Sequence, residues 1–210
     1  MKSNGNGWLR GRSEILGRYA QGLPDGQDRI QVAFDGPNYG WMPVHFIKNG
    51  VDMGFVEFSD VYDCFEPLRE WLESVACNQC SNASVVNLDC EDWQAVLYYE
   101  PIWFFDHSCK RELWPGNCGI FSVYDESDDR FILDAYCETG TFVRDFYKCL
   151  TDFARVMTDK IEFVEDWVPQ SWQAKFGDPE DDDPRMREMF IGLVRSQKIE
   201  DYLKEIDSRR

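Results

Sequence analysis

The sequence predicts an α+β domain: a curved, mainly antiparallel sheet of about six to eight strands packed with two helices, plus a C-terminal helix. Short segments that alternate apolar and polar residues, typical of strands with one buried face, make up most of the chain. Two apolar stripes with helical spacing interrupt them. The expected order, β-β-β-α-β-β-β-β-β-α-α, lacks the regular strand–helix alternation of a parallel sheet.

The first three strands are expected at residues 30–34, 42–46 and 51–58, where apolar and polar side chains alternate. Asn49-Gly50 separates the second from the third. This dipeptide favours a two-residue hairpin turn, because a type I′ turn needs positive φ at both central positions. The sequence therefore predicts a hairpin with its tip at Asn49-Gly50.

The first helix is expected over residues 62–77, where apolar side chains recur at three- and four-residue steps. Acidic residues before it are candidate caps. Further strands are expected after this helix, several of them separated by turn-forming residues. They are residues 85–88, 93–99, 102–105, 120–124 and 131–137.

The second helix is expected from about residue 141 to residue 160, with an apolar stripe from Phe142 to Ile161. Asp183-Pro184 predicts the start of the C-terminal helix, because proline is favoured at the first helical position. The stripe of that helix shifts phase near Gln197, which indicates a bend or a change of packing partner.

These elements divide the chain into three parts. Residues 1–26 are expected to be a flexible or short-helical N-terminal arm, and residues 27–177 the α+β core domain. Residues 178–210 are expected to form a helical extension packed on the core, through which the chain could also form a homo-oligomer.

The charge of the chain is uneven. The formal net charge is −17, and residues 60–140 carry 17 acidic and four basic side chains, a net charge of −13. A field of this sign repels phosphate backbones and anionic lipid, which argues against nucleic-acid and membrane partners. A basic protein is the better-matched partner. The alternative is that the charge serves only solubility.

The chain shows no apolar run long enough to span a membrane, and its polar start does not resemble a signal peptide. We therefore expect a cytoplasmic protein whose eight cysteines are free thiols. Several of them occupy inward-facing positions of the expected strands and helices, where a free thiol packs as a small apolar side chain.

The candidate partner-binding residues are acidic side chains in the expected turns of the middle region, with tryptophans as apolar anchors. They are Asp89, Glu91, Asp92, Asp125, Glu126, Asp128, Asp129, Trp93 and Trp114. The sequence thus favours a non-catalytic binding protein, by analogy an immunity-type or inhibitor protein that engages a basic partner.

The alternative is a small enzyme or a metal-binding protein. Cys77-x-x-Cys80, with His107 and Cys109, is the candidate ligand set. The spacing of a second ligand pair is irregular, and Cys77 follows a helix, which is the wrong end for lowering a thiol pKa. Glu100 and Asp106 are weak acid–base candidates. Phosphate-binding, dinucleotide-binding and hydrolase motifs are absent, so we predict neither cofactor nor catalytic residue.

Overall fold

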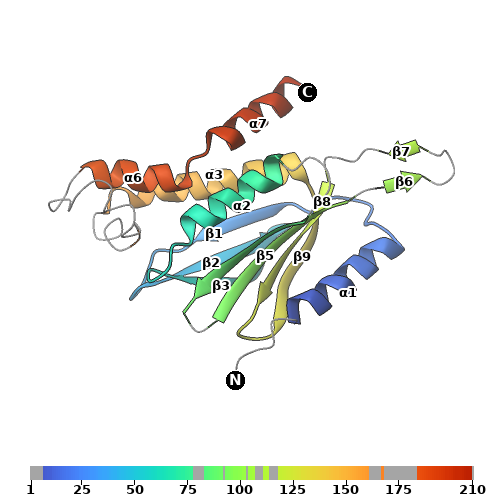
Figure 1. The fold of residues 1–210 in the computed structure, drawn as a ribbon, viewed down its shortest axis with the longest axis horizontal. Coiled ribbons are helices and arrows are strands. Elements are labelled where there is room, and N and C mark those ends of the chain that lie inside the picture. The colour runs from blue at the N-terminus through green and yellow to red at the C-terminus, as the bar shows by residue number, and fades with distance from the viewer. Residues whose placement is uncertain are drawn as a thin grey trace.

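The computed structural model describes residues 7–77, 83–91, 93–102, 104–106, 111–113, 118–160, 167 and 184–209. Figure 1 shows their arrangement. The elements in chain order are α1 (Gly7–Gln21), β1 (Ile30–Phe34), β2 (Trp41–Lys48), β3 (Val51–Ser59), α2 (Phe65–Cys77), β4 (Ser84–Cys90), β5 (Trp93–Pro101), β6 (Phe104–Asp106), β7 (Arg111–Leu113), β8 (Cys118–Asp125), β9 (Arg130–Glu138), α3 (Thr139–Met157), α6 (Pro184–Val194) and α7 (Gln197–Ser208).

The first three strands form an antiparallel sheet in the order β1-β2-β3. Lys48 pairs with Val51 around the predicted turn, where Asn49 and Gly50 have φ of 53° and 82°. The hairpin predicted from Asn49-Gly50 is therefore confirmed, because both residues adopt the left-handed conformation that a type I′ turn requires.

A second antiparallel sheet has the order β4-β5-β8-β9, and β6 pairs with β7 in a separate hairpin between β5 and β8. The α+β class is confirmed, but the prediction of one curved sheet of six to eight strands is wrong. The chain leaves β3 at Ser59, forms α2, and returns as β4, which pairs with β5. The two sheets pack against each other. For example, Gly54 on β3 lies against the side chain of Ile132 on β9.

The core lies between the sheets and helices α2 and α3. Both helices carry the apolar stripes seen in the sequence, and their aromatic residues pack on the inner strand β8. The ring centroids of Phe121 on β8 and Phe142 on α3 are 4.8 Å apart. The ring of Trp71 on α2 lies 5.9 Å from the ring of Phe121. Each fully buried phenylalanine contributes about 1.5–3 kcal/mol of transfer free energy.

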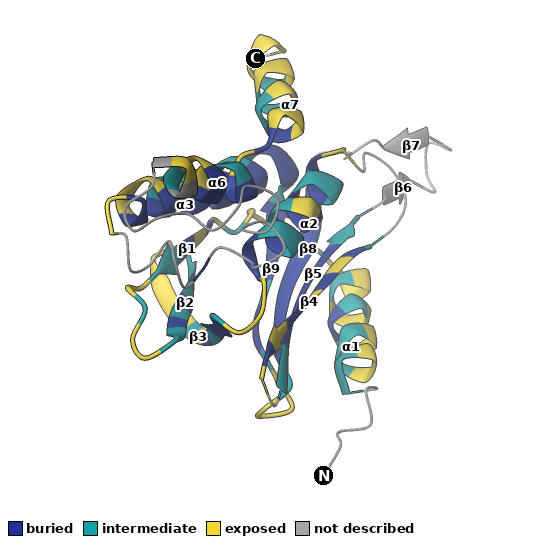
Figure 2. Cartoon of the chain, turned by 60° about the vertical axis from the view of Figure 1, so that its left-hand side comes forward, coloured by how far each residue is buried: buried dark blue, intermediate teal, exposed yellow. Residues whose placement is uncertain are grey.

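Helix α1 lies on the other face of the four-stranded sheet, away from α2 and α3 (Figures 1 and 2). Trp8 contacts Tyr98 on β5, and Gly11 lets the helix approach the ring of Phe131 on β9. Arg12 bonds to Glu100 at 2.6 Å, so the N-terminal segment is a docked helix over residues 7–21. Among the described residues, no helix is long and apolar enough to cross a membrane.

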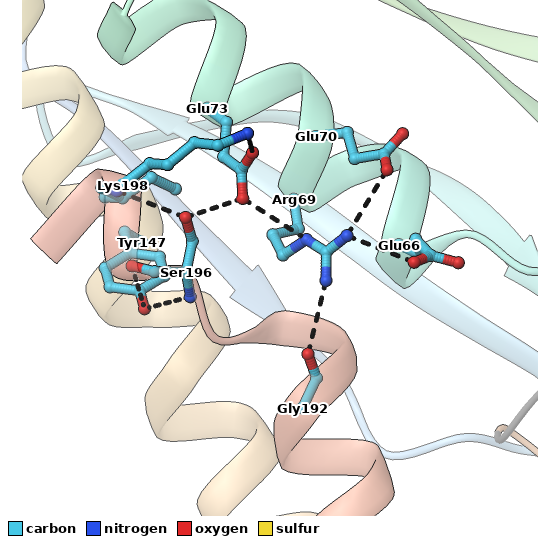
Figure 3. Close-up of polar contacts among 9 residues, drawn as sticks. Glu66, Arg69, Glu70, Glu73, Tyr147, Gly192, Ser196 and Lys198 are labelled. Atoms are coloured by element: carbon cyan, nitrogen blue, oxygen red, sulfur yellow. Dashed lines mark hydrogen bonds and ion pairs between the residues drawn. The ribbon is translucent and has the colours of Figure 1, made fainter. Parts of the chain in front are cut away.

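The C-terminal helices α6 and α7 pack on α2 and α3, and a polar node fixes the turn between them (Figure 3). Ser196 caps α7, donates its hydroxyl to Glu73 at 2.7 Å, and donates its backbone N–H to the Tyr147 hydroxyl at 2.9 Å. Arg69, whose side chain is 14% exposed, contacts Glu66 and donates to the carbonyl of Gly192. These contacts hold the turn between α6 and α7. This turn is the bend that the sequence indicated by the phase shift of the apolar stripe near Gln197.

Candidate partner-binding surface

Two acidic turns come together at one end of the four-stranded sheet, opposite the β6–β7 hairpin (Figure 1). The turn between β4 and β5 lies beside the turn between β8 and β9 because Ala95 pairs with Asp125. The backbone N–H of Gln94 donates to the carboxylate of Glu126 at 3.1 Å, and the N–H of Glu126 donates to the carbonyl of Gln94 at 3.1 Å.

We call this region the acidic end. It consists of Asp89, Glu91, Asp125, Glu126, Asp128 and Asp129. The tips of both hairpins are exposed (Figure 2), whereas Asp125 is only 7% exposed and accepts hydrogen bonds from Ser127. The structure thus brings together six of the predicted partner-binding residues, from Asp89 to Asp129 in the sequence, at one end of the sheet.

Uncharged donors hold several of these carboxylates. Asp89 accepts from the Gln94 side chain, Glu91 from the Ser59 hydroxyl at 3.0 Å, and Asp129 from the Tyr124 hydroxyl. Asp128 has an ion pair with Arg130. Asp89, Glu91, Asp125 and Asp129 are therefore oriented by hydrogen bonds and form no ion pair with a described residue, although Arg130 lies opposite Asp125 in the β8–β9 ladder.

Elsewhere on the described surface, carboxylates commonly pair with arginine or lysine. The pairs include Arg12–Glu100, Arg18–Asp134, Arg29–Asp145, Lys48–Asp28 and Arg144–Asp207, with N···O distances between 2.6 and 3.0 Å. This contrast makes the acidic end a concentrated source of negative potential, because the charges of the other carboxylates are partly neutralised locally.

The pKa values of Cys90 and Tyr124, which lie next to the acidic end, are both raised. Burial raises the pKa of the Cys90 thiol to about 12, and the charges of Asp89 and Asp125 add to the shift. Burial also raises the pKa of Tyr124, reinforced by its hydrogen bond to Asp129 and by the charge of that carboxylate. Both shifts favour the uncharged form, so the thiol and phenol add no charge to the acidic end near neutral pH.

The backbone at two of these acidic residues is in the left-handed region. Glu91 has φ of 60° and Asp129 has φ of 50°. Glycine, asparagine and aspartate are the residues that such turn positions favour, so Asp129 suits its position and Glu91 does not. The side chain of Glu91 costs about 1–2 kcal/mol in this conformation, so the turn after β4 carries this charge at some expense in stability.

The predicted anchors are placed differently. Trp93 is half-buried and packs against the core, so its ring supports the hairpin. Asp92 and Trp114 lie outside the described residues. The exposed aromatic residues beside the acidic end are instead Tyr39 and Tyr62, which are 96% and 39% exposed. The glycines and proline around Tyr39 indicate a turn in the sequence. They do not show that its ring is exposed, because exposure depends on which residues pack around the ring in the folded protein.

The structure brings together none of the predicted metal ligands within its described ranges. Cys77 is an exposed free thiol at the end of α2, and Cys80, His107 and Cys109 lie outside the described residues. No group of three or more possible ligand residues occurs in the part of the chain that the structure describes. Glu100 is held by Arg12, and the side chain of Asp106 is among those not described.

Four other described cysteines are buried, and His45 lies between two carboxylates. Cys64, Cys90, Cys118 and Cys137 are buried, and burial raises the pKa of the Cys64 and Cys137 thiols. The thiols of Cys64, Cys90 and Cys137 therefore stay protonated and are poor nucleophiles. His45 lies on the outer face of the three-stranded sheet, between Asp52 at 2.9 Å and Asp35 at 3.4 Å.

A groove of about 340 Å³ lies between α3, α6 and α7. Its lining includes Tyr147, Val194, Arg155 and Arg195. Both guanidinium groups already contact a carboxylate, Arg155 with Asp152 and Arg195 with Glu200. The groove adjoins the polar node of Figure 3 through Tyr147, and it belongs to the docking of the C-terminal helices.

Comparison with protein-family models, with curated proteins and with solved structures finds no match to this chain.

Proposed function

We propose that this chain is a non-catalytic, cytoplasmic binding protein that engages a basic protein through its acidic end, in the manner of an inhibitor or immunity protein. The observation that carries the proposal is the acidic end itself: six acidic residues in and next to two adjoining turns, all but Asp125 at least partly exposed, with several carboxylates oriented by uncharged donors. Such an arrangement attracts a cationic partner and speeds its association.

Three features of the described residues support this proposal over a catalytic one. The thiols of Cys64 and Cys90 have raised pKa values, the carboxylate of Glu100 is held by Arg12, and His45 is held by two carboxylates. None of these groups is arranged as a nucleophile next to a general base. The exposed carboxylates of the turns are suited to long-range electrostatic attraction.

The experiment measures binding of a fluorescein-labelled hexa-lysine peptide by fluorescence anisotropy at 20 and 500 mM NaCl. Binding is expected at the lower salt concentration and lost at the higher one, because screening shortens the reach of exposed charges. The double variant Asp89→Asn/Asp129→Asn should weaken binding about three- to ten-fold, since each removed charge contributes a few tenths of a kcal/mol or more.

The matched control is the double variant Asp201→Asn/Glu205→Gln on α7, which changes the net charge equally but removes carboxylates that pair with Lys204 and Arg209. It should change the dissociation constant less than two-fold. Equal losses in the two double variants would show that only net charge matters, and absence of binding at 20 mM NaCl would refute the proposal.

A further inference from the structure

Two turns beside the acidic end present exposed apolar side chains. The first is a hairpin turn, residues 38–41, closed by the Asn38–Trp41 bridge. The second follows β3, at residues 59–62, where the Tyr62 N–H donates to the Ser59 carbonyl. Their side chains Tyr39, Val61 and Tyr62 are 96%, 66% and 39% exposed. We call these two segments the tyrosine turns.

The tyrosine turns are joined to each other and to the acidic end by hydrogen bonds. The N–H of Asp60 donates to the carbonyl of Gly40 at 3.0 Å, which fixes the first turn against the second. Ser59 then donates its hydroxyl to Glu91 at 3.0 Å. The turn before β2, the turn after β3 and Glu91 in the turn after β4 are therefore linked by hydrogen bonds, which places the exposed rings at the same side of the molecule as the acidic end.

The backbone at Tyr39 is also unusual, because its φ is 53°. A non-glycine residue is disfavoured there, and a fully exposed ring makes no packing contact that would offset the cost. The carboxylate of Asp60 lies directly against the neighbouring Gly40. The first turn thus holds an aromatic ring in solvent next to negative charge.

We propose that the tyrosine turns are the contact surface for arginine side chains of the basic protein partner, an inference that rests on the function proposed above. Charge complementarity selects a cationic occupant, and the exposed rings select arginine over lysine. A planar guanidinium group stacks on an aromatic face while its N–H groups bond to a neighbouring carboxylate, whereas the ammonium group of lysine is a compact, strongly hydrated charge. Within this protein, Arg12 makes such a pair of contacts, with its guanidinium 5.0 Å from the Tyr98 ring and bonded to Glu100.

The experiment compares labelled hexa-arginine and hexa-lysine peptides at 20 mM NaCl. The unaltered protein is expected to bind hexa-arginine more tightly than hexa-lysine. The double variant Tyr39→Asn/Tyr62→Ser should weaken hexa-arginine binding about four-fold or more, because each exposed cation–π contact is worth about two- to five-fold. Binding of hexa-lysine should change less than two-fold.

Two control variants separate the ring from other effects. Tyr39→Phe keeps the aromatic face and should keep the preference for arginine. Val156→Ser removes an apolar side chain that is 60% exposed on α3 and should alter neither affinity. Circular dichroism melting curves verify that each variant is folded.

Several outcomes overturn this inference. Equal losses for the two peptides, or no loss in the tyrosine double variant, would contradict it while leaving the acidic-end proposal intact if Asp89→Asn/Asp129→Asn still weakens binding. A concentration-dependent dimer in sedimentation velocity that Tyr39→Asn dissolves would assign the surface to a second copy of the chain. Failure of both peptides to bind would remove the proposed function and this inference together.

Discussion

At the scale of single residues, most of the turns with a left-handed backbone are also turns of the proposed partner surface. The non-glycine residues with positive φ in the described ranges are Tyr39, Asn49, Glu91 and Asp129. Asn49 is the residue that its turn favours, followed by Gly50. The other three carry an aromatic ring or a carboxylate at the proposed partner surface. Tyr39 and Glu91 are strained in this conformation, and strained residues collect at binding sites, where the side chain matters more than local stability.

The first prediction concerns Tyr39. Replacing it with asparagine should raise the free energy of unfolding by about 0.5–1 kcal/mol, because asparagine tolerates the left-handed conformation and the 96% exposed ring has almost no packing to lose. Urea denaturation measures this change, and Tyr39→Phe should leave the stability unaltered. A loss of stability in Tyr39→Asn would show that the ring is packed in solution.

At the scale of elements, helix α1 shows how one glycine permits docking and another weakens a helix. A Cβ at Gly11 would overlap the ring of Phe131, whereas nothing lies within 4 Å of a Cβ at Gly17. Both glycines lie inside α1. Of these two glycines, Gly11 is the one that the close approach of the helix to β9 requires.

The second prediction uses this pair of glycines. Gly17→Ala should stabilise the protein by about 0.5–1 kcal/mol, since alanine has the higher helix propensity. Gly11→Ala should instead destabilise it by about 1–3 kcal/mol, because the overlap with Phe131 forces a shift of helix or ring. Thermal denaturation of the two variants tests the docking of α1. A gain of stability in both would mean that the helix does not pack on β9 in solution.

At the scale of the whole molecule, the C-terminal helices are attached through charged groups on α2. Glu73, whose side chain is 15% exposed, accepts from Ser196 and pairs with Lys198 at 2.8 Å. Burial alone would raise the pKa of Glu73, but the hydrogen bonds from Lys198 and Ser196 outweigh it, so the pKa lies below its ordinary value of 4.5. The attachment of α7 to α2 thus depends on an ionised carboxylate.

The third prediction concerns acid stability. A carboxyl group whose pKa is lowered by folding stabilises the native state above its unfolded pKa, and this stabilisation disappears as the pH falls through the folded-state pKa. For Glu73 the loss begins near pH 4.5 and continues below it. Glu73→Gln should cost about 1–3 kcal/mol at pH 6, because Lys198 and Arg69 lose a charged partner. Its stability should also fall less than that of the unaltered protein between pH 6 and pH 3.

The control for this prediction is Glu70→Gln. The side chain of Glu70 is 65% exposed and has a 3.5 Å contact with Arg69, so its loss should cost less than about 0.5 kcal/mol. Urea denaturation at pH 6, 4 and 3 measures all three proteins. Parallel pH profiles for the unaltered protein and Glu73→Gln would contradict the assigned role of Glu73.

Much of the local structure could be predicted from short sequence patterns, namely apolar–polar alternation, turn-forming dipeptides and apolar stripes with helical spacing. The alternation in residues 30–34 and 51–58 defined strands, and Asn49-Gly50 defined the turn, because these signals depend only on backbone preference and side-chain period. The stripe after residue 141 defined α3 in the same way. The division into two sheets could not be read from these patterns, since alternation marks a buried face but names no pairing partner.

The sequence by itself determined the α+β class, most of the element positions and the acidic character of the middle region. Only the tertiary structure decided that the acidic turns of β4–β5 and β8–β9 adjoin, that Trp93 supports the core, and that Tyr39 and Tyr62 stand exposed beside Glu91. The physical reason is that periodicity and turn preference act over a few residues. Strand pairing and burial depend on contacts between residues far apart in the chain, and these contacts determine which charges and rings share a surface.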